Sequence, residues 1–571
     1  MDRLPRIAFW GALIGPAAAI LFLVLRFGVN VPFWDDWELA RPLIRLANGS
    51  VPGWTELASQ HNEHRMLFPR LVMLPLASVT RWNVHVNMVV SVALAGMSLA
   101  VLMALARPIL VQAGAAGRVW AALTLSAIVF SLTQWENWLW GWQVQWFLAV
   151  LGAILAVAFA TWSLRSDRPW AHLAGAAGAA FVCQYSIASG AAIWVCVVFV
   201  LAFHPRRRRA LPVILAVAAA ATALYLVGYT RPLHHPSPLV ALERPLAFLT
   251  YLGNYASGPL GRNTAFGLGA MAAFLALAII AIRRFHTAPE LVVPWIAMGA
   301  FAVANAVLTG IGRVGFGAEQ GFMSRYATVS LLLSVALVPL GMLALRAWPA
   351  GRWPTARTTT AVIAAGLMTL LVARADIKAW AGFAERSALM VENRRCLMLI
   401  ERATDECLKL VYPNPLLLRL RIKQLQAIGW SGFPEDPARP RGTIRLKDPE
   451  GLFLWRLRAE DSTVGWIHSA TLDRGTLTVT GWARHPHGNL EGTRKILVAA
   501  DGVVLGEAEI AGERPDVAAV FKDASFLRTG WTLQAQVTSA TSRLGLLEAY
   551  LVFGEDVLIA LEGYAKIDAA R

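Results

Sequence analysis

The sequence is poor in charge and in cysteine, and these two shortages narrow the classes of protein that it can encode. Of its 571 residues only 15% are charged and four are cysteines, whereas 57% are hydrophobic, and the mean hydropathy is +0.52. Apolar runs of nearly twenty residues recur through the first two thirds of the chain, which is the length that a helix needs to cross a bilayer. The composition therefore argues against an ordinary soluble protein and predicts a polytopic α-helical membrane protein.

Eleven apolar stretches are candidate transmembrane helices. The fifth and sixth are separated only by the interruption from Ser186 to Gly190, and merging them would reverse the orientation of every later segment. The stretches are 7–27, 84–106, 119–134, 142–163, 172–187, 188–204, 210–229, 264–282, 291–309, 326–346 and 360–374.

Arginines are concentrated in every second loop. Short cytoplasmic loops are enriched in Lys and Arg, and the alternate loops here are short and basic, including the run from Arg206 to Arg209. This pattern predicts an inside N-terminus and an outside C-terminus. The formal charge of +16 then reflects topology and attraction to membrane lipids, because the arginines are spread over separate loops and do not form one nucleic-acid-binding patch.

Other shortages bear on function. The predicted spans contain almost no acids or bases, whereas a transporter would place such groups near the middle of the membrane; only the interruption at 186–190 favours transport. Within residues 1–375 no serine or cysteine stands directly beside a histidine, which disfavours acyl transfer through a nucleophile.

Acidic residues gather just after the first span, in a long first outer loop at 28–83. Asp35 and Asp36 are adjacent, and Glu38 follows them. Acidic groups are costly to hold beside a bilayer, so they suggest chemistry. One aspartate could act as a general base toward a hydroxyl or bind a divalent cation. Alternatively, the acids cap the first interfacial helix.

The same loop carries a second polar cluster, which consists of His61, Glu63, His64, Arg65 and Arg70. The spacing is not the His-Glu-x-x-His pattern of a zinc site. We expect the basic members to hold an anionic group, with Glu63 orienting one of them through a salt bridge. The alternative is a solvated polar turn.

Two later outer loops supply the remaining candidates. A tryptophan-rich turn contains Glu136, Asn137 and Gln143; it is either an interfacial aromatic belt or a surface that suits a sugar ring. Farther on, Arg325 could pair with Glu319, clamp a phosphate at the membrane surface, or simply extend its charge to the interface.

Beyond the last span the chain changes character. Residues 376–427 read as extracytoplasmic helices, 428–442 as a Pro/Gly-rich linker, and 443–571 as short alternating strands of a β-sandwich domain. Cys396 and Cys407 would form a disulfide only if the helix turned near Thr404 and Asp405, because eleven residues of straight helix span about 16 Å. The cysteines otherwise stay free.

Three tryptophans of the β-domain, Trp466, Trp482 and Trp531, each follow a glycine in or beside a strand-like run. We interpret them as core residues, with a sugar-binding platform as the alternative.

The whole arrangement resembles the GT-C superfamily of integral-membrane glycosyltransferases. The resemblance covers residues 5–375 and rests on the Asp35-Asp36 pair, the long first outer loop, about eleven spans and the late outer Arg325. The runs Gly481-Trp482-Ala483-Arg484 and Arg514-Pro515-Asp516-Val517 resemble small β-domains of bacterial envelope proteins.

The resemblance implies a bacterial inner-membrane enzyme that moves a sugar from a polyprenyl-phosphate donor to an extracytoplasmic glycan or lipid-glycan acceptor. Asp35 or Asp36 would be the base, and Arg325 with the basic groups of the first loop would stabilise the leaving phosphate, with inversion at the sugar. Some members of the superfamily use a divalent cation at the acidic motif and others do not, so the metal stays open. The alternatives are a polysaccharide polymerase or ligase, or a transporter of lipid-linked glycans.

Overall fold

The chain folds into two compact units. The computed structural model describes residues 3–47, 49–232, 236–348, 354–398, 403–427, 456–457, 465–484, 495–500, 503–521, 523–536, 547–553 and 557–563. The first unit comprises Met1–Val31, Gly53–Met73 and Val84–Glu392, and the second comprises Pro32–Pro52, Leu74–Asn83 and Asn393–Arg571. The predicted linker at 428–442 lies outside the described residues.

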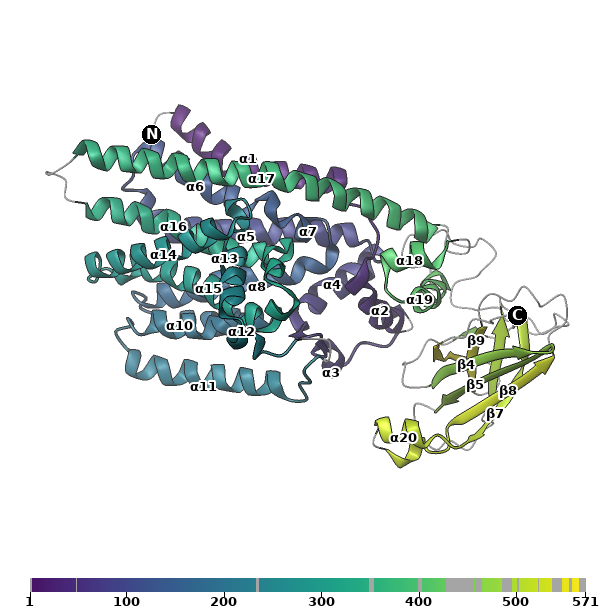
Figure 1. Cartoon of the computed structure of the whole chain (residues 1–571). Coiled ribbons are helices and arrows are strands. Elements are labelled where there is room, and N and C mark those ends of the chain that lie inside the picture. Colours follow the sequence, from purple (N-terminus) through teal and green to yellow (C-terminus); the bar gives the residue numbers. More distant parts are fainter. Residues whose placement is uncertain are drawn as a thin grey trace. The chain divides into compact units, whose positions relative to one another are not determined.

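Long apolar helices dominate the first unit, where they lie side by side and nearly parallel (Figure 1). A helix satisfies its own backbone hydrogen bonds, as an apolar phase requires. Among the described residues, nine helical segments are long and apolar enough to cross a membrane, so the chain is a multi-pass helical membrane protein. They are built on α1 (Arg3–Phe27), α5 (Val84–Leu110), α6 (Ala115–Val129), α8 (Val144–Ser163), α11 (Arg207–Leu226), α14 (Thr264–Arg284), α15 (Val293–Arg313), α16 (Ala327–Ala347) and α17 (Pro354–Met398).

The predicted spans 172–187 and 188–204 account for the difference between eleven and nine. They fold as two separate but short helices, joined by a turn at the predicted interruption. Gly190 permits this turn, because a Cβ at that position would overlap the carbonyl oxygen of Cys183. The elements are α9 (Pro169–Gln184), the 3-10 turn η4 (Ala188–Ala192) and α10 (Ile193–Leu201).

Several basic loops meet at one end of these helices. His204, which follows α10, donates from Nε2 to the carbonyl oxygen of Ser163 at the end of α8 (3.1 Å). Arg165 lies 2.6 Å from the carboxylate of Glu290 in the loop before α15. Arg346 donates to a carbonyl oxygen near the end of α5. The loops that the sequence predicted to share one side of the membrane are therefore in contact.

The smaller helices are also present. The predicted interfacial segments of the first outer loop form α2 and α4, and the Trp-rich turn includes α7. Their bounds are α2 (Ala40–Ala47), α3 (Trp54–Leu57), α4 (Leu67–Thr80), α7 (Trp135–Trp138), α12 (Val240–Glu243) and α13 (Pro245–Ala256).

The helix α17 runs without a break through the predicted boundary between 375 and 376. Its 45 residues correspond to about 67 Å, and no proline interrupts it. Cys396 near its end is joined to Cys407 of α18 (Asp405–Val411) by a disulfide, with Cα atoms 5.8 Å apart. The hydroxyl of Thr404 caps α18 by accepting the backbone N–H of Cys407 (3.3 Å). The disulfide and the predicted turn at Thr404 are thus confirmed, and α19 (Pro415–Ala427) follows.

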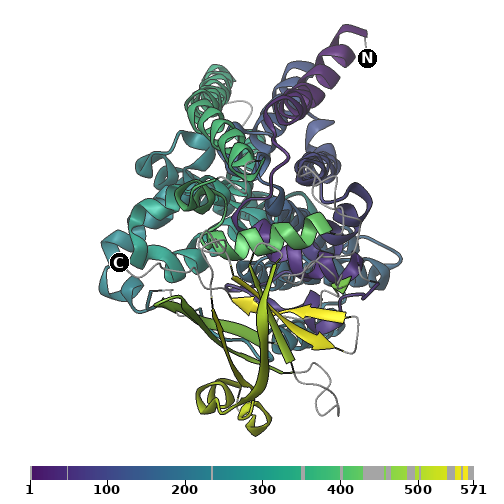
Figure 2. The same ribbon diagram turned by 90° about the vertical axis from the view of Figure 1, so that its right-hand side faces the viewer.

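The β-domain of the second unit is one curved sheet. The sequence predicted a two-sheet sandwich, but the nine strands among the described residues pair in the single order β11-β4-β5-β8-β7-β6-β9-β10-β3. The long strand β7 joins the two halves, because it pairs with β6 along its length and with β8 near Ile510 and Gly512. Register shifts in both pairings bend the sheet into a half-barrel (Figure 2).

The concave side of the half-barrel holds the domain's core, which includes Val479, Ile496 and Trp531. The strands are β3 (Arg456–Leu457), β4 (Gly465–Asp473), β5 (Thr476–Ala483), β6 (Lys495–Ala500), β7 (Val503–Gly512), β8 (Gly530–Gln536), β9 (Leu547–Phe553), β10 (Val557–Ala560) and β11 (Glu562–Gly563), with α20 (Pro515–Phe521) between β7 and β8.

Small residues let the helices α13 and α14 approach closely, and this contact is open to a direct test. A Cβ at Gly267 would overlap the carbonyl oxygen of Gly253, whereas a Cβ at Gly269, on the same helix, would meet nothing within 4 Å. We therefore expect Gly267→Ala to lower the stability by about 1–3 kcal/mol through overpacking. Gly269→Ala should leave the thermal midpoint of the detergent-solubilised protein unchanged or slightly raised. Equal midpoints for the two variants would contradict this helix contact.

Candidate functional site

A small β-hairpin organises the polar part of the first outer loop. The strands β1 (Gln60–His61) and β2 (His64–Arg65) pair antiparallel, and Asn62 in the turn takes a left-handed φ of +49°, which asparagine tolerates. The side chain of Gln60 exchanges two hydrogen bonds with the backbone of Thr230, donating at 2.5 Å and accepting at 3.0 Å. The hairpin is thereby fastened to the loop that follows α11.

Glu63 at the tip of the hairpin ties it to α15. Its carboxylate lies 2.5 Å from the guanidinium of Arg313 and 3.7 Å from Nε2 of His64. Burial raises the pKa of Glu63, but His64 and Arg313 more than offset this and lower the pKa from 4.5 to about 2. His64 also accepts the backbone N–H of Ala188 at Nδ1 (3.0 Å). Of the basic residues predicted to pair with Glu63, His64 lies near it, at 3.7 Å, and the shorter contact is with Arg313, which the sequence did not indicate.

The two arginines predicted to bind an anion make backbone contacts. Arg65 donates to the carbonyl oxygens of Ala58 (3.0 Å), Tyr225 (2.6 Å) and Val227. Arg70 donates to three carbonyl oxygens of the preceding segment, those of Glu56, Leu57 and Ser59 (3.1, 3.0 and 2.7 Å). Donors used in this way hold the loop in place, so we assign both side chains a positioning role.

The Trp-rich turn docks on the start of α16. It consists of η2 (Leu132–Gln134), α7 and η3 (Gly141–Gln143). Asn137 donates from Nδ2 to the carbonyl oxygen of Arg325 (2.9 Å) and to the hydroxyl of Thr328 (2.6 Å), and that hydroxyl donates to Gln134 (2.7 Å). Ser324 donates to the carbonyl oxygen of Thr133 (2.8 Å). This network of polar contacts fixes Asn137 well inside the protein.

Glu136 and Arg325 form the second charged pair of this region. The Arg325 guanidinium lies 3.8 Å from Oε1 of Glu136 and 5.4 Å from the ring centre of Tyr326. Glu136 is buried and Arg325 is half-buried, whereas Glu319, the partner predicted for Arg325, is exposed. Within the described part of the chain, Oε2 of Glu136 and Oδ1 of Asn137 are buried without a hydrogen-bond partner. Burial of such atoms costs free energy unless a water molecule or a ligand forms a hydrogen bond with them.

The hairpin and the Trp-rich turn contact one another through their aromatic rings. His61 packs edge-on against Trp142, with ring centres 5.1 Å apart. The neighbouring Gln143 is buried and accepts a hydrogen bond from Gln145 (3.3 Å). The first unit thus brings candidates from three loops into contact, namely the hairpin, the Trp-rich turn and the segment before α16.

The acidic residues after the first span belong to the second unit. Asp36 is fully buried, and its carboxylate accepts the backbone N–H of Phe33 (3.1 Å), so it caps the 3-10 helix η1 (Trp34–Leu39). Asp35 in the same turn is only half-buried. The capping interpretation therefore describes Asp36, and Asp35 is the more accessible carboxylate.

Glu38, the third acid, is tied to the helices α18 and α19. Its carboxylate accepts the hydroxyl of Tyr412 (3.1 Å) and lies 3.7 Å from the guanidinium of Arg421. Arg421 also donates to the carbonyl oxygen of Trp37 (2.9 Å). These bonds hold the acidic turn against α19, and nothing in the sequence between the two segments signals the pairing.

The acidic pair has few neighbouring side chains that could serve as ligands of a divalent cation. Among the described residues, no set of three histidine, cysteine or carboxylate groups at metal-binding spacing includes Asp35 or Asp36. Asp36 is engaged as a cap and Glu38 by Tyr412. The described residues therefore show no preformed set of three such ligands at this pair.

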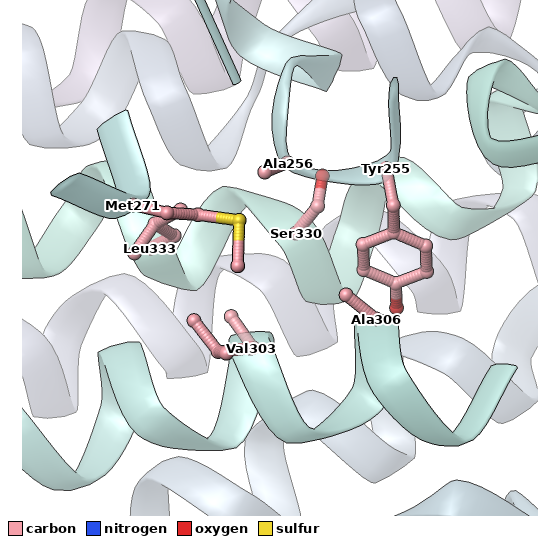
Figure 3. Close-up of a pocket in the computed structure, with 8 residues that line it drawn as sticks. Tyr255, Ala256, Met271, Val303, Ala306, Ser330 and Leu333 are labelled. Atoms are coloured by element: carbon pink, nitrogen blue, oxygen red, sulfur yellow. The ribbon is translucent and has the colours of Figure 1, made fainter. Parts of the chain in front are cut away.

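Two hollows lie near Tyr255 in the first unit. One is apolar and is lined by residues of four helices, including Met271, Val303 and Leu333, with only the hydroxyls of Tyr255 and Ser330 as polar groups (Figure 3). The other is polar and includes Ser324, Phe322 and Arg262. Arg262, whose guanidinium lies 5.6 Å from the ring centre of Phe322, carried no sequence signal that set it apart from other loop arginines.

The Glu63–Arg313 pair generates a pH prediction. A folded pKa near 2, below the ordinary 4.5, means that the pair stabilises the protein fully above about pH 5 and that this stabilisation is lost as the pH falls toward 2. The difference corresponds to at most about 3 kcal/mol. Glu63→Gln should therefore lower the thermal midpoint at pH 7, and the gap to the wild type should narrow between pH 5 and pH 3. A gap that is independent of pH, or matched by the exposed control Glu243→Gln, would contradict the pair's role.

The sequence matches no protein-family model and no curated protein. The roles of the residues above therefore follow from their contacts and from the chemistry of their side chains.

Proposed function

We propose that this protein is an integral-membrane glycosyltransferase of the bacterial inner membrane. It would move a sugar from a polyprenyl-phosphate donor to an acceptor of the cell envelope. The observation that carries the proposal is the difference between the two adjacent aspartates: Asp36 is buried as a cap, whereas Asp35 keeps a half-buried carboxylate. A partly buried carboxylate in a rigid turn after a membrane helix has the properties of a general base.

The chemistry assigned to Asp35 is proton abstraction. Its carboxylate takes the proton of an acceptor hydroxyl, and the oxygen attacks the anomeric carbon of the donor sugar. The bond from that carbon to the phosphate oxygen breaks, polyprenyl phosphate leaves, and the configuration at the carbon inverts. We assign Arg325 the stabilisation of the leaving phosphate, because its guanidinium is half-buried and a guanidinium pairs well with phosphate oxygens.

We further propose eleven membrane crossings, with the N-terminus inside and the C-terminal domain outside. The turn between α9 and α10 contacts His64 of the hairpin, while the far end of α10 contacts Ser163 through His204. These two contacts support a separate crossing by each of the short helices. The disulfide Cys396–Cys407 supports an outside location for the second unit, since disulfides persist in oxidising compartments.

A transporter of lipid-linked glycans is the second candidate, favoured by the break between α9 and α10. Transporters use broken helices to expose binding groups at mid-membrane. Here the buried Gln184 beside the break accepts the indole N–H of Trp194 (2.7 Å) and donates to Thr222 (3.3 Å). The break also lies at the loop end of the helices, beside His64. Both features weaken the transport alternative.

The two aspartates should respond differently to the same substitution. Asp35→Asn removes the base and should lower the rate of sugar transfer from a polyprenyl-phosphate donor by about 10²-fold or more. Asp36→Asn keeps an oxygen that can accept the Phe33 N–H and should retain most of the activity. Both variants should be inserted and stable in the membrane. An active Asp35→Asn beside an inactive but folded Asp36→Asn would reverse the assignment.

The topology can be tested with single cysteines at exposed positions. Asp167→Cys and Arg208→Cys flank the α9–α10 pair, and Glu243→Cys follows α11. In intact spheroplasts a membrane-impermeant maleimide should label only Glu243→Cys, and permeabilisation should expose the other two. Labelling of Asp167→Cys and Arg208→Cys from opposite sides would mean that α9 and α10 together cross the membrane once.

A further inference from the structure

The convex face of the β-domain carries an unusual set of side chains. Along β5 the residues alternate, with Leu477 and Val479 buried in the core and the threonines between them turned outward. The strands β4, β5 and β8 lie side by side (Figure 1) and are in register, so their outward residues form rows. The rows contain Ser469, Thr471, Thr476, Thr478, Thr480, Thr532, Gln534 and Gln536, with one charged residue, the exposed Asp473 opposite Thr476, and we call this set the hydroxyl–amide face.

The hydroxyl–amide face is nearly uncharged, in contrast with the other half of the same sheet. Across β6 and β7 the outward residues Lys495, Glu507 and Glu509 are charged, and Lys495 lies 3.0 Å from Glu507. Solvated protein surfaces ordinarily mix Lys, Arg, Glu and Asp. A patch of hydroxyls and amides on three strands therefore differs from a surface that serves solubility alone.

An exposed tryptophan stands at one end of this face. Trp466 of β4 is 39% exposed, and it is the one large aromatic side chain in the described part of the β-domain that is so exposed. Its neighbour across the strands, Trp482, is covered by Val517 and Phe526 from the α20 segment. The interpretation of all three tryptophans as core residues is therefore wrong for Trp466 and confirmed for Trp482 and Trp531.

We propose that the hydroxyl–amide face, with Trp466 as its aromatic platform, binds a neutral polysaccharide. Sugar hydroxyls both donate and accept hydrogen bonds, as do threonine hydroxyls and glutamine amides. The apolar face of a sugar ring packs on an indole, which presents a large flat surface with little conformational freedom. The face measures about 20 Å along the strands and about 10 Å across them, which accommodates a short stretch of a glycan chain.

The composition of the face selects against other partners. A nucleic acid or an anionic lipid would require lysines and arginines, and the rows contain none. A stable protein partner would require an apolar centre, whereas Trp466 is a single apolar residue at one end. The side chains of Thr471, Thr478 and Gln534, which form one row, have no hydrogen-bond partner among the described residues, so they are available to a ligand.

The test uses the full-length protein in nanodiscs and a panel of immobilised polysaccharides. Neutral probes are amylose, a soluble β-glucan, a galactan and a mannan, and dextran sulfate is the anionic probe. At least one neutral polymer should retain the wild-type protein, and calorimetry with its soluble fragment should give the dissociation constant. Trp466→Ala should raise that constant about tenfold, and Thr478→Ala with Gln534→Ala should raise it further.

The control is Val520→Ala, which removes an even more exposed apolar side chain (78%) from α20 and should bind like the wild type. All these positions lie on the surface, so equal thermal midpoints should show that the variants are folded. Retention by dextran sulfate alone, retention by no probe, or equal affinities for Trp466→Ala and Val520→Ala would overturn the proposal. None of these results depends on sugar transfer, so the experiment tests the proposed binding face independently of the proposed activity.

Discussion

The ion pair between Glu63 and Arg313 is the contact on which the polar end of the first unit depends. It joins the tip of the hairpin to the end of α15 at 2.5 Å, and the neighbouring His64 links the same hairpin to the turn between α9 and α10. Without it a half-buried guanidinium would lose this carboxylate and Glu63 would keep only the longer contact with His64 at 3.7 Å. The positions of several loops are set by this one interaction.

Around this pair, polar side chains form hydrogen bonds with the backbone of loops that lie at the end of the apolar helices. Arg65 and Arg70 satisfy carbonyl oxygens, and Asn137 joins the Trp-rich turn to the start of α16. Rigid loops are a precondition for chemistry, because a catalytic group must be held in place by its neighbours. Our functional proposal assigns the chemistry to Arg325 of the first unit and to Asp35 of the second unit, both of which are half-buried.

The sequence was sufficient to predict the elements that depend on the local pattern of residues. Hydropathy located the helices, the break at Gly190 and the interfacial segments, and the turn at Thr404 allowed the disulfide to Cys407. It missed what depends on partners far along the chain: Arg313 for Glu63, Arg421 for Glu38, and the pairing of β7 with β8 that turns a sandwich into one sheet. It also predicted that all three tryptophans are buried. The glycine before each tryptophan does not indicate which face of the sheet the indole occupies.

The most direct test of the central claim is to identify the lipid that the protein carries. Native mass spectrometry of the protein purified from its own membrane in a mild detergent would measure the mass of any bound molecule, and fragmentation would identify it. Our account predicts a polyprenyl-phosphate-linked sugar, with less of it retained by Arg325→Ala than by the wild type. Bound phospholipid alone, in equal amount in both proteins, would contradict the proposed transferase.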